Sequence, residues 1–109
     1  MSETPYRLEY YLDKNGDAPF TKWLESLRDR SAFARIVTRL DRVRLGNFGI
    51  HKSLGDGVHE LKIDYGPGYR LYYAMTGSTV VLLLIGGDKS TQDKDTETAK
   101  AYWKRQQEG

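Results

Sequence analysis

Cysteine is absent from this chain of 109 residues, and histidine occurs only twice. Without cysteine the protein can form neither a disulfide nor a thiolate metal site, and it has no thiol nucleophile. His51, His59 and the acidic residues show no spacing typical of metal ligands. We therefore expect no metal site and no other cofactor, and the composition suits the cytoplasm.

Long hydrophobic runs and a one-sided charge are lacking as well. The longest apolar run, Val80 to Ile85, is too short to cross a bilayer, and the first residues do not resemble a signal peptide. These absences predict a cytoplasmic protein with no membrane partner. The 17 lysines and arginines against 15 acidic residues give a net charge of only +2, so nucleic-acid binding would require locally clustered cations.

The first part of the chain predicts one strand and two helices. The strand covers residues 6–12, and Asp17 is expected to cap the first helix, with Pro19 in its first turn. Ser31 is expected to begin the second helix, which Gly46 ends. The apolar residues of this second helix recur at helical spacing and are Phe33, Ile36, Val37, Leu40 and Val43.

Residues 58–91 predict a three-stranded antiparallel meander, after a predicted loop over residues 47–57. A Gly-Pro-Gly turn and a Thr-Gly-Ser turn separate the three strands. The apolar faces of the first two strands coincide only if the first turn contains an odd number of residues. One face then carries Leu61, Ile63, Leu71, Tyr73 and Met75, and the other carries Glu60, Lys62, Asp64, Arg70 and Tyr72.

A last helix is expected from Ser90 or Thr91 to about Gln106. The order strand, two helices, three strands and helix fits a single domain over residues 1–109. The predicted class is α+β, with an antiparallel four-stranded twisted sheet, two N-terminal helices packed on one face and a C-terminal helix. The last strand is apolar on both faces and is expected inside the sheet. The first strand can pair either with this last strand or with the neighbour of the last strand.

The polar face of the meander gathers groups that bind phosphate. Arginine can hold two phosphate oxygens and lysine adds a compact charge, so Lys62 and Arg70, with Lys89 at the rim, favour a polyanion. Tyr72 or Tyr73 could stack on an exposed RNA base. The alternative is that Lys62 and Arg70 are solvated residues paired with nearby carboxylates.

The second predicted helix carries a basic side formed by Arg35, Arg39 and Arg42. This side can track phosphates, bind an acidic partner segment or simply be solvated. The sequence pattern alone leaves these three alternatives open.

Three segments resemble the RelE/ParE toxin superfamily, and within it the HigB-like, phage Gp49-related addiction module killer proteins. The segments are Glu60-Leu61-Lys62, Gly68-Tyr69-Arg70-Leu71-Tyr72-Tyr73 and Gly87-Asp88-Lys89-Ser90. The resemblance implies the toxin of a type II toxin–antitoxin pair, which cleaves mRNA in the ribosomal A site without a metal. In such a cleavage the RNA 2′-OH attacks the neighbouring phosphate.

The resemblance also implies roles for individual residues. Lys62 matches a basic residue that activates the 2′-OH or steadies the phosphate, and Arg70 matches the arginine that holds the scissile phosphate. Lys89 falls near the residue that protonates or neutralises the leaving group. Glu60 stands where RelE has a lysine and is a candidate general base. The residues expected to contact RNA are Tyr72, Tyr73, Lys52 and Ser90.

The implied partners are mRNA on the ribosome and a cognate antitoxin, expected to be a helix-turn-helix protein encoded by the adjacent gene. Arg35, Arg39 and Arg42 are the expected docking site for the antitoxin. Two other functions remain open for the same fold. One is a ParE-like inhibitor of DNA gyrase, and the other is an inactive module that only binds its partner.

Overall fold

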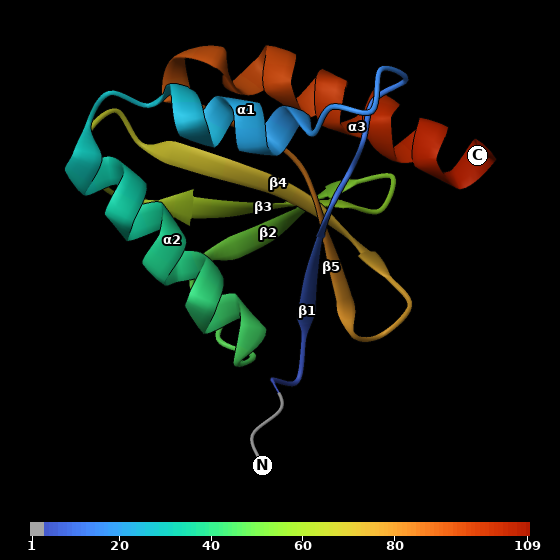
Figure 1. Ribbon diagram of the computed structural model, residues 1–109, viewed down its shortest axis with the longest axis horizontal. Helices are drawn as coiled ribbons and strands as arrows, with labels where there is room; N and C mark the ends of the chain where they lie inside the picture. Colours follow the sequence, from blue (N-terminus) through green and yellow to red (C-terminus); the bar gives the residue numbers. More distant parts are fainter. Residues whose placement is uncertain (1–3) are drawn as a thin grey trace.

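The structure, a computed structural model, describes residues 4–109 and is built around a five-stranded sheet. The strands are β1 (Arg7–Tyr10), β2 (His51–Gly55), β3 (Val58–Ile63), β4 (Tyr69–Thr76) and β5 (Val80–Asp88). The helices are α1 (Pro19–Ser26), α2 (Arg30–Arg44) and α3 (Gln92–Glu108), and a short 3₁₀ turn, η1 (Lys89–Thr91), precedes α3. Figure 1 shows α1 and α2 in front of the strands. The predicted α+β class with a C-terminal helix is confirmed.

Strands β3, β4 and β5 form the predicted antiparallel meander. Leu61 lies opposite Leu71, and Lys62 lies opposite Arg70. The turn over residues 64–68 has an odd length, as the apolar pattern requires. Lys62 and Arg70 therefore share one face of the sheet, as predicted.

Strand β2 lies in the segment predicted as a loop, so that prediction is wrong. It pairs antiparallel with β3 through a tight turn at residues 55–57, where the φ angles are 89°, 58° and 84°. The turn sequence Gly-Asp-Gly suits these left-handed conformations. The segment His51-Lys52-Ser53 is exposed at the sheet edge, so it lacks the alternation of apolar and polar residues that identifies a strand.

The sheet is mixed, with five strands instead of the predicted four. Its order is β1-β5-β4-β3-β2, and β1 runs parallel to β5 while the other pairs are antiparallel. Two helices stand between β1 and the rest of the sheet in sequence, which allows this parallel entry. Strand β5 lies between β1 and β4, so its predicted interior position is confirmed.

Helices cover both faces of the sheet, whereas helices on one face were expected. Side chains of α1 and α2 form one core cluster with Leu61, Leu71 and Leu83. Ala99 of α3 belongs to a second cluster with Leu84 on the opposite face. Because β5 is apolar on both faces, each face needs its own helical cover.

Two adjacent glycines at the end of β5 allow both helical layers to approach. A Cβ at Gly86 would lie 2.1 Å from the Trp23 ring of α1, and a Cβ at Gly87 would lie 1.8 Å from an Asp95 oxygen of α3. Any larger residue would therefore displace a helix. At this Gly-Gly pair the sheet therefore contacts α1 on one face and α3 on the other.

Aspartates define two helix starts, although not at the expected positions. Asp29 caps α2 by accepting a hydrogen bond from the Ser31 N–H at 2.9 Å. Asp88 has the same role before η1. Thr91, one of the two residues predicted to begin the last helix, holds the N-cap position of α3, although its side chain makes no capping hydrogen bond. The predicted cap Asp17 is wrong, because no side chain caps α1.

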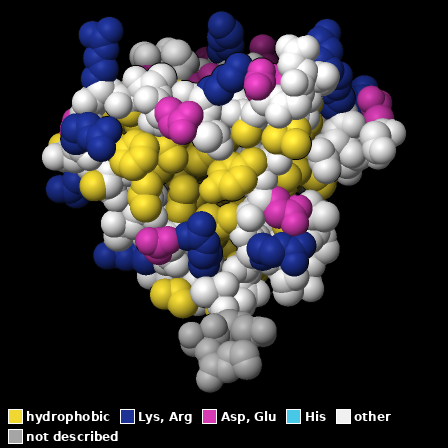
Figure 2. Space-filling model, in the orientation of Figure 1, with side chains coloured by type: hydrophobic (Ala, Val, Ile, Leu, Met, Phe, Trp, Pro, Cys, Tyr) yellow, Lys and Arg dark blue, Asp and Glu magenta, His cyan; other side chains and the backbone are white. Residues whose placement is uncertain are grey.

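The apolar stripe predicted for α2 is only partly buried. Ile36, Leu40 and Val43 lie in the core, whereas Val37 is 36% exposed. Figure 2 shows hydrophobic side chains in the middle of the face that α1 and α2 cover, with lysines and arginines around them. Over residues 4–109, no helix combines the length and apolar character needed to cross a bilayer.

Candidate nucleic-acid cleft

A cleft of about 200 Å³ opens where β2, β3 and β4 lie side by side. We call it the cationic cleft; its lining residues are Ile50, His51, Lys52, Glu60, Lys62 and Arg70. Four of these six side chains were predicted site residues. The sheet register brings Lys62 and Arg70 face to face, and it places Lys52 opposite Glu60 on the neighbouring pair.

Arg70 is buried in the cleft wall, with 7% of its surface exposed, and the protein fixes its orientation. Its Nε lies 3.3 Å from Glu60 Oε1 in an ion pair without hydrogen-bond geometry, and its Nη1 donates to the Gly68 carbonyl oxygen at 3.1 Å. A guanidinium held at two atoms keeps its planar fork in one orientation. Because Nη2 donates to no side chain or carbonyl in the described residues, it remains available to an anion in the cleft.

Glu60 is 3% exposed, and its carboxylate forms ion pairs with the cations around it. Besides its pairing with Arg70, its Oε2 lies 3.8 Å from Lys52 Nζ. A carboxylate occupied by two cations is a poor acceptor for a third proton donor, so the predicted role of Glu60 as general base does not fit this geometry. Glu60 is instead a positioning residue for Arg70.

Lys52 and Lys62 place ammonium groups at the cleft from two different strands. The Lys52 side chain is 61% exposed, and Lys62 is half-buried. The Lys62 N–H donates to the Ile50 carbonyl oxygen at 3.0 Å, which fixes its strand against the loop before β2. The predicted participation of both lysines in one cationic site agrees with these positions.

His51 was not among the predicted site residues and borders the cationic cleft at the sheet edge. It pairs with Leu61, and its ring centre lies 5.9 Å from that of Phe48, so the imidazole lies on the α2 face of the sheet. Its Nδ1 lies 2.8 Å from the Gly49 carbonyl oxygen, and a carbonyl can only accept, so Nδ1 carries a proton. In the neutral ring this leaves the Nε2 lone pair as the acceptor. Sequence reasoning missed His51 because the strand that carries it was predicted as loop.

Tyr72 and Tyr73 do not lie where an RNA base could stack on them from the cleft. Tyr72 is fully buried beneath α3, and Tyr73 is 3% exposed in the core on the α2 side of the sheet. The prediction that either ring stacks on an open base is therefore wrong for this conformation. Burial raises the pKa of Tyr72 to about 12, and its hydroxyl makes no hydrogen bond of good geometry in the described residues.

Lys89 and Ser90 lie outside the cationic cleft, in η1. A Cβ built on Gly68 would lie 3.6 Å from Arg70 Nη1 and 3.8 Å from the Lys89 Cβ, so both residues flank this turn. The Ser90 hydroxyl donates to Asp88 within the cap of η1. Both residues are exposed, and neither lines the cationic cleft.

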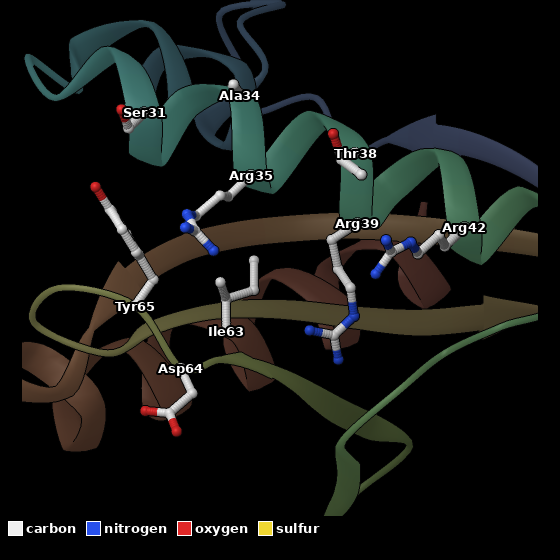
Figure 3. A pocket seen from close by; sticks show the side chains of 9 residues that line it. All are labelled: Ser31, Ala34, Arg35, Thr38, Arg39, Arg42, Ile63, Asp64 and Tyr65. Atoms are coloured by element: carbon white, nitrogen blue, oxygen red, sulfur yellow. The ribbon is translucent and has the colours of Figure 1, made fainter.

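A second, larger groove of about 530 Å³ lies between α2 and the residues around the β3–β4 turn (Figure 3). Arg35 and Arg42 are exposed along it, and the Arg35 guanidinium lies 4.2 Å from the centre of the Tyr65 ring. We call it the helix groove; it is lined by Ser31, Ala34, Arg35, Thr38, Arg39, Arg42, Ile63, Asp64 and Tyr65.

Arg39 differs from its two neighbours because its guanidinium is bound within the protein. It donates to the carbonyl oxygens of Lys62, Phe48 and Ile50 at 2.8, 3.0 and 3.1 Å. Burial, followed by the charge of Arg42, lowers its pKa from the ordinary arginine value. The predicted use of Arg39 as a partner-binding residue does not fit these contacts, which make it a structural tie between α2 and β3.

Across residues 4–109, no group of three or more His, Asp or Glu side chains is placed to hold a metal ion. The titratable residues that line the cationic cleft are two lysines, one arginine, one glutamate and one histidine. Such groups can stabilise a charged phosphate and move a proton.

Comparisons with known proteins place these residues in a family. The family model described as "Phage derived protein Gp49-like (DUF891)" matches residues 22–105, which include every residue that lines the cationic cleft. A protein of Haemophilus influenzae, described as an uncharacterized protein, is 51% identical over 81 residues, covering 74% of this chain and 82% of that protein. The Gp49-like family is associated with RelE-type addiction-module killer proteins. The chain belongs to the phage-derived Gp49-like protein family.

Proposed function

We propose that this protein is the toxin of a type II toxin–antitoxin pair and cleaves mRNA on the ribosome. The observation that carries the proposal is the cationic cleft, in which a buried carboxylate fixes an arginine beside two lysines and a histidine. Preorganised cations of this kind stabilise the charge that develops on a phosphate during cleavage. Membership of the Gp49-like family supports the same class of activity.

In the proposed reaction the RNA linkage lies across the sheet edge, where His51 borders both cavities. His51 Nε2 accepts the proton of the RNA 2′-OH, and the resulting oxygen attacks the adjacent phosphorus. The P–O5′ bond breaks, which leaves a 2′,3′-cyclic phosphate and a free 5′-OH. Arg70 Nη2 and Lys62 neutralise the pentacoordinate phosphate, and Lys52, at the exposed mouth of the cleft, returns a proton to the leaving oxygen. Glu60 acts by holding Arg70.

The test is a ribosome-dependent cleavage assay with purified protein, read by mapping the 5′ ends of the products. Wild-type protein is expected to cut mRNA only when ribosomes are present and to leave 2′,3′-cyclic ends. His51→Ala and Lys62→Ala are each expected to slow cleavage by about 100-fold. A His51→Ala protein with full activity would overturn the assignment of the base.

Two other outcomes would reject the nuclease itself. DNA damage signalling without loss of mRNA would indicate a gyrase inhibitor. A full-length protein that neither arrests growth nor cleaves RNA would indicate a module that only binds its partner.

The proposal includes an antitoxin that docks in the helix groove through Arg35 and Arg42, whose guanidinium groups are exposed. Reversing both charges, as Arg35→Glu with Arg42→Glu, should weaken the toxin–antitoxin complex by at least about tenfold. The matched control reverses Lys22 and Lys104, which are exposed on α1 and α3. Equal affinities for the two double variants would place the antitoxin elsewhere.

A further inference from the structure

A third cavity, of about 450 Å³, lies on the α2 side of the sheet beside strand β2. We call it the aromatic groove; its principal lining residues are Tyr6, Phe48, His51, His59, Tyr73 and Met75. Its volume falls in the range of about 300–1,000 Å³ that is usual for small-ligand sites. Neither the predicted function nor the proposed mechanism gives this groove a role.

Phe48 is the centre of the groove, where aromatic rings meet. Its ring centre lies 5.0 Å from that of Tyr6, 5.8 Å from that of Tyr73 and 5.9 Å from that of His51. Behind it, the His59 ring lies nearly parallel to that of Tyr73, at 5.3 Å. Phe48 is only half-buried, so the rings beneath it support an aromatic side chain that still faces the cavity.

The aromatic groove and the cationic cleft meet at the sheet edge. His51 and Lys52 line both cavities, and they sit on β2, which has no further strand beyond it in the described part of the chain. A strand of RNA could therefore cross the edge at Lys52, with its phosphate on one side and a base on the other. No acidic residue lines the aromatic groove, so nothing there repels the RNA backbone.

We infer that the aromatic groove binds a base next to the cleaved linkage, stacked on Phe48, and so sets the base preference of cleavage. This inference rests on the proposed function, because the cationic cleft supplies the phosphate site. Stacking on aromatic rings is the common way that single-stranded RNA bases are held. The two imidazoles, His51 and His59, add hydrogen-bonding groups at the groove wall.

The experiment measures RNA binding apart from cleavage. Isotope-labelled protein is titrated with a pentanucleotide made uncleavable by a 2′-deoxy group at the scissile linkage, and with the same RNA lacking one flanking base. Phe48→Leu keeps an apolar side chain but removes the ring. It should weaken binding of the intact RNA at least about fivefold and leave binding of the abasic RNA unchanged.

Two variants serve as controls. Tyr65→Leu removes an aromatic ring from the helix groove and should change neither affinity. Lys62→Ala should weaken both RNAs equally, because both keep the phosphate. Thermal unfolding of each variant checks that the fold is intact.

Several results would overturn the inference. Equal binding of intact RNA by Phe48→Leu and wild type, with Lys62→Ala still weakened, would reject the base site and leave the proposed function standing. Equal weakening of both RNAs by Phe48→Leu would show a general effect on the cleft. Loss of antitoxin binding with unchanged RNA affinity would assign the groove to a protein partner. No binding of either RNA by the wild type would reject the groove and the phosphate site together.

Discussion

Arg70 and Arg39 both carry guanidinium groups drawn into the protein, one at the cationic cleft and one under α2. Arg70 meets a carboxylate and a single carbonyl, and its Nη2 donates to no group in the described residues. Arg39 meets three carbonyls and has little left to offer a ligand. The difference shows that burial alone does not identify a functional arginine. What identifies it is a donor that the protein leaves unused.

The largest expected effect comes from Arg70→Lys, which keeps the charge but loses the planar fork. Ribosome-dependent cleavage should fall by about 100- to 1,000-fold, or about 3–4 kcal/mol of transition-state stabilisation. Because the lysine ammonium can still pair with Glu60, the loss in the free energy of unfolding should be smaller than this loss of transition-state stabilisation. Parallel cleavage and urea-unfolding measurements would separate the two effects.

A companion variant tests whether the ion pair between Arg70 and Glu60 stabilises the folded protein. Arg70→Met combined with Glu60→Leu replaces both charges by apolar side chains and should fold about as stably as the wild type. It should nevertheless be inactive. A double variant that cleaves mRNA normally would show that cleavage does not require Arg70.

Arg39→Met should give the opposite profile, with stability as the main loss. Three carbonyls lose a charged donor, so the free energy of unfolding should fall by about 3 kcal/mol. Arg35→Met is the matched control, because Arg35 contacts only the Tyr65 ring at the surface and should cost about 0.5–1 kcal/mol. Similar losses for the two variants, measured by urea unfolding, would contradict the distinction drawn between them.

Gly49→Ala tests the packing of the Arg39 guanidinium against the segment before β2. Gly49 has a φ of 62°, and a Cβ there would lie 2.5 Å from Arg39 Nη2. The left-handed conformation alone costs a larger residue about 1–2 kcal/mol, and the close contact adds to it. In the Arg39→Met background the steric part should shrink, because a flexible methionine can move aside. A double-mutant cycle would measure this coupling.

The smallest effect is confined to alkaline solution and concerns Tyr72. Burial raises its pKa from about 10 to about 12, so the neutral hydroxyl stabilises the folded state fully below pH 10. This contribution is lost as the pH rises from about 10 through about 12. Tyr72→Phe should therefore lose less stability than the wild type over that interval. Parallel losses in the two proteins would show that Tyr72 does not titrate as the structure requires.

The meander and its register could be predicted because the residues alternate and the apolar faces must match. That reasoning placed Lys62 and Arg70 on one face of the sheet, and the structure adds that they lie directly opposite each other. It could not find β2, because an exposed edge strand has no alternation to detect. Because β2 was not predicted, His51 was missed as a cleft residue, although Lys52 on the same strand was predicted to contact RNA.

The sequence pattern also could not predict which groups each arginine and carboxylate contacts in the folded protein. Arg35, Arg39 and Arg42 share a helix side, yet only Arg39 is captured by carbonyls. Those carbonyls come from β3 and from residues 48–50, which approach α2 only in the folded chain. Likewise, Glu60 looks like a free carboxylate in sequence and becomes a support for Arg70 through the β3–β4 register.

The parallel pairing of β1 with β5 has a consequence for biosynthesis. β1 leaves the ribosomal exit tunnel early, but the strand beside which it belongs emerges only after nearly all of the described chain has been made. Such long-range pairing forms late and slowly. The wall that carries Arg70 also borders β5, so the nascent protein would acquire its phosphate-binding geometry only near completion. For the proposed nuclease, this order of synthesis would delay cleavage until most of its own message has been translated.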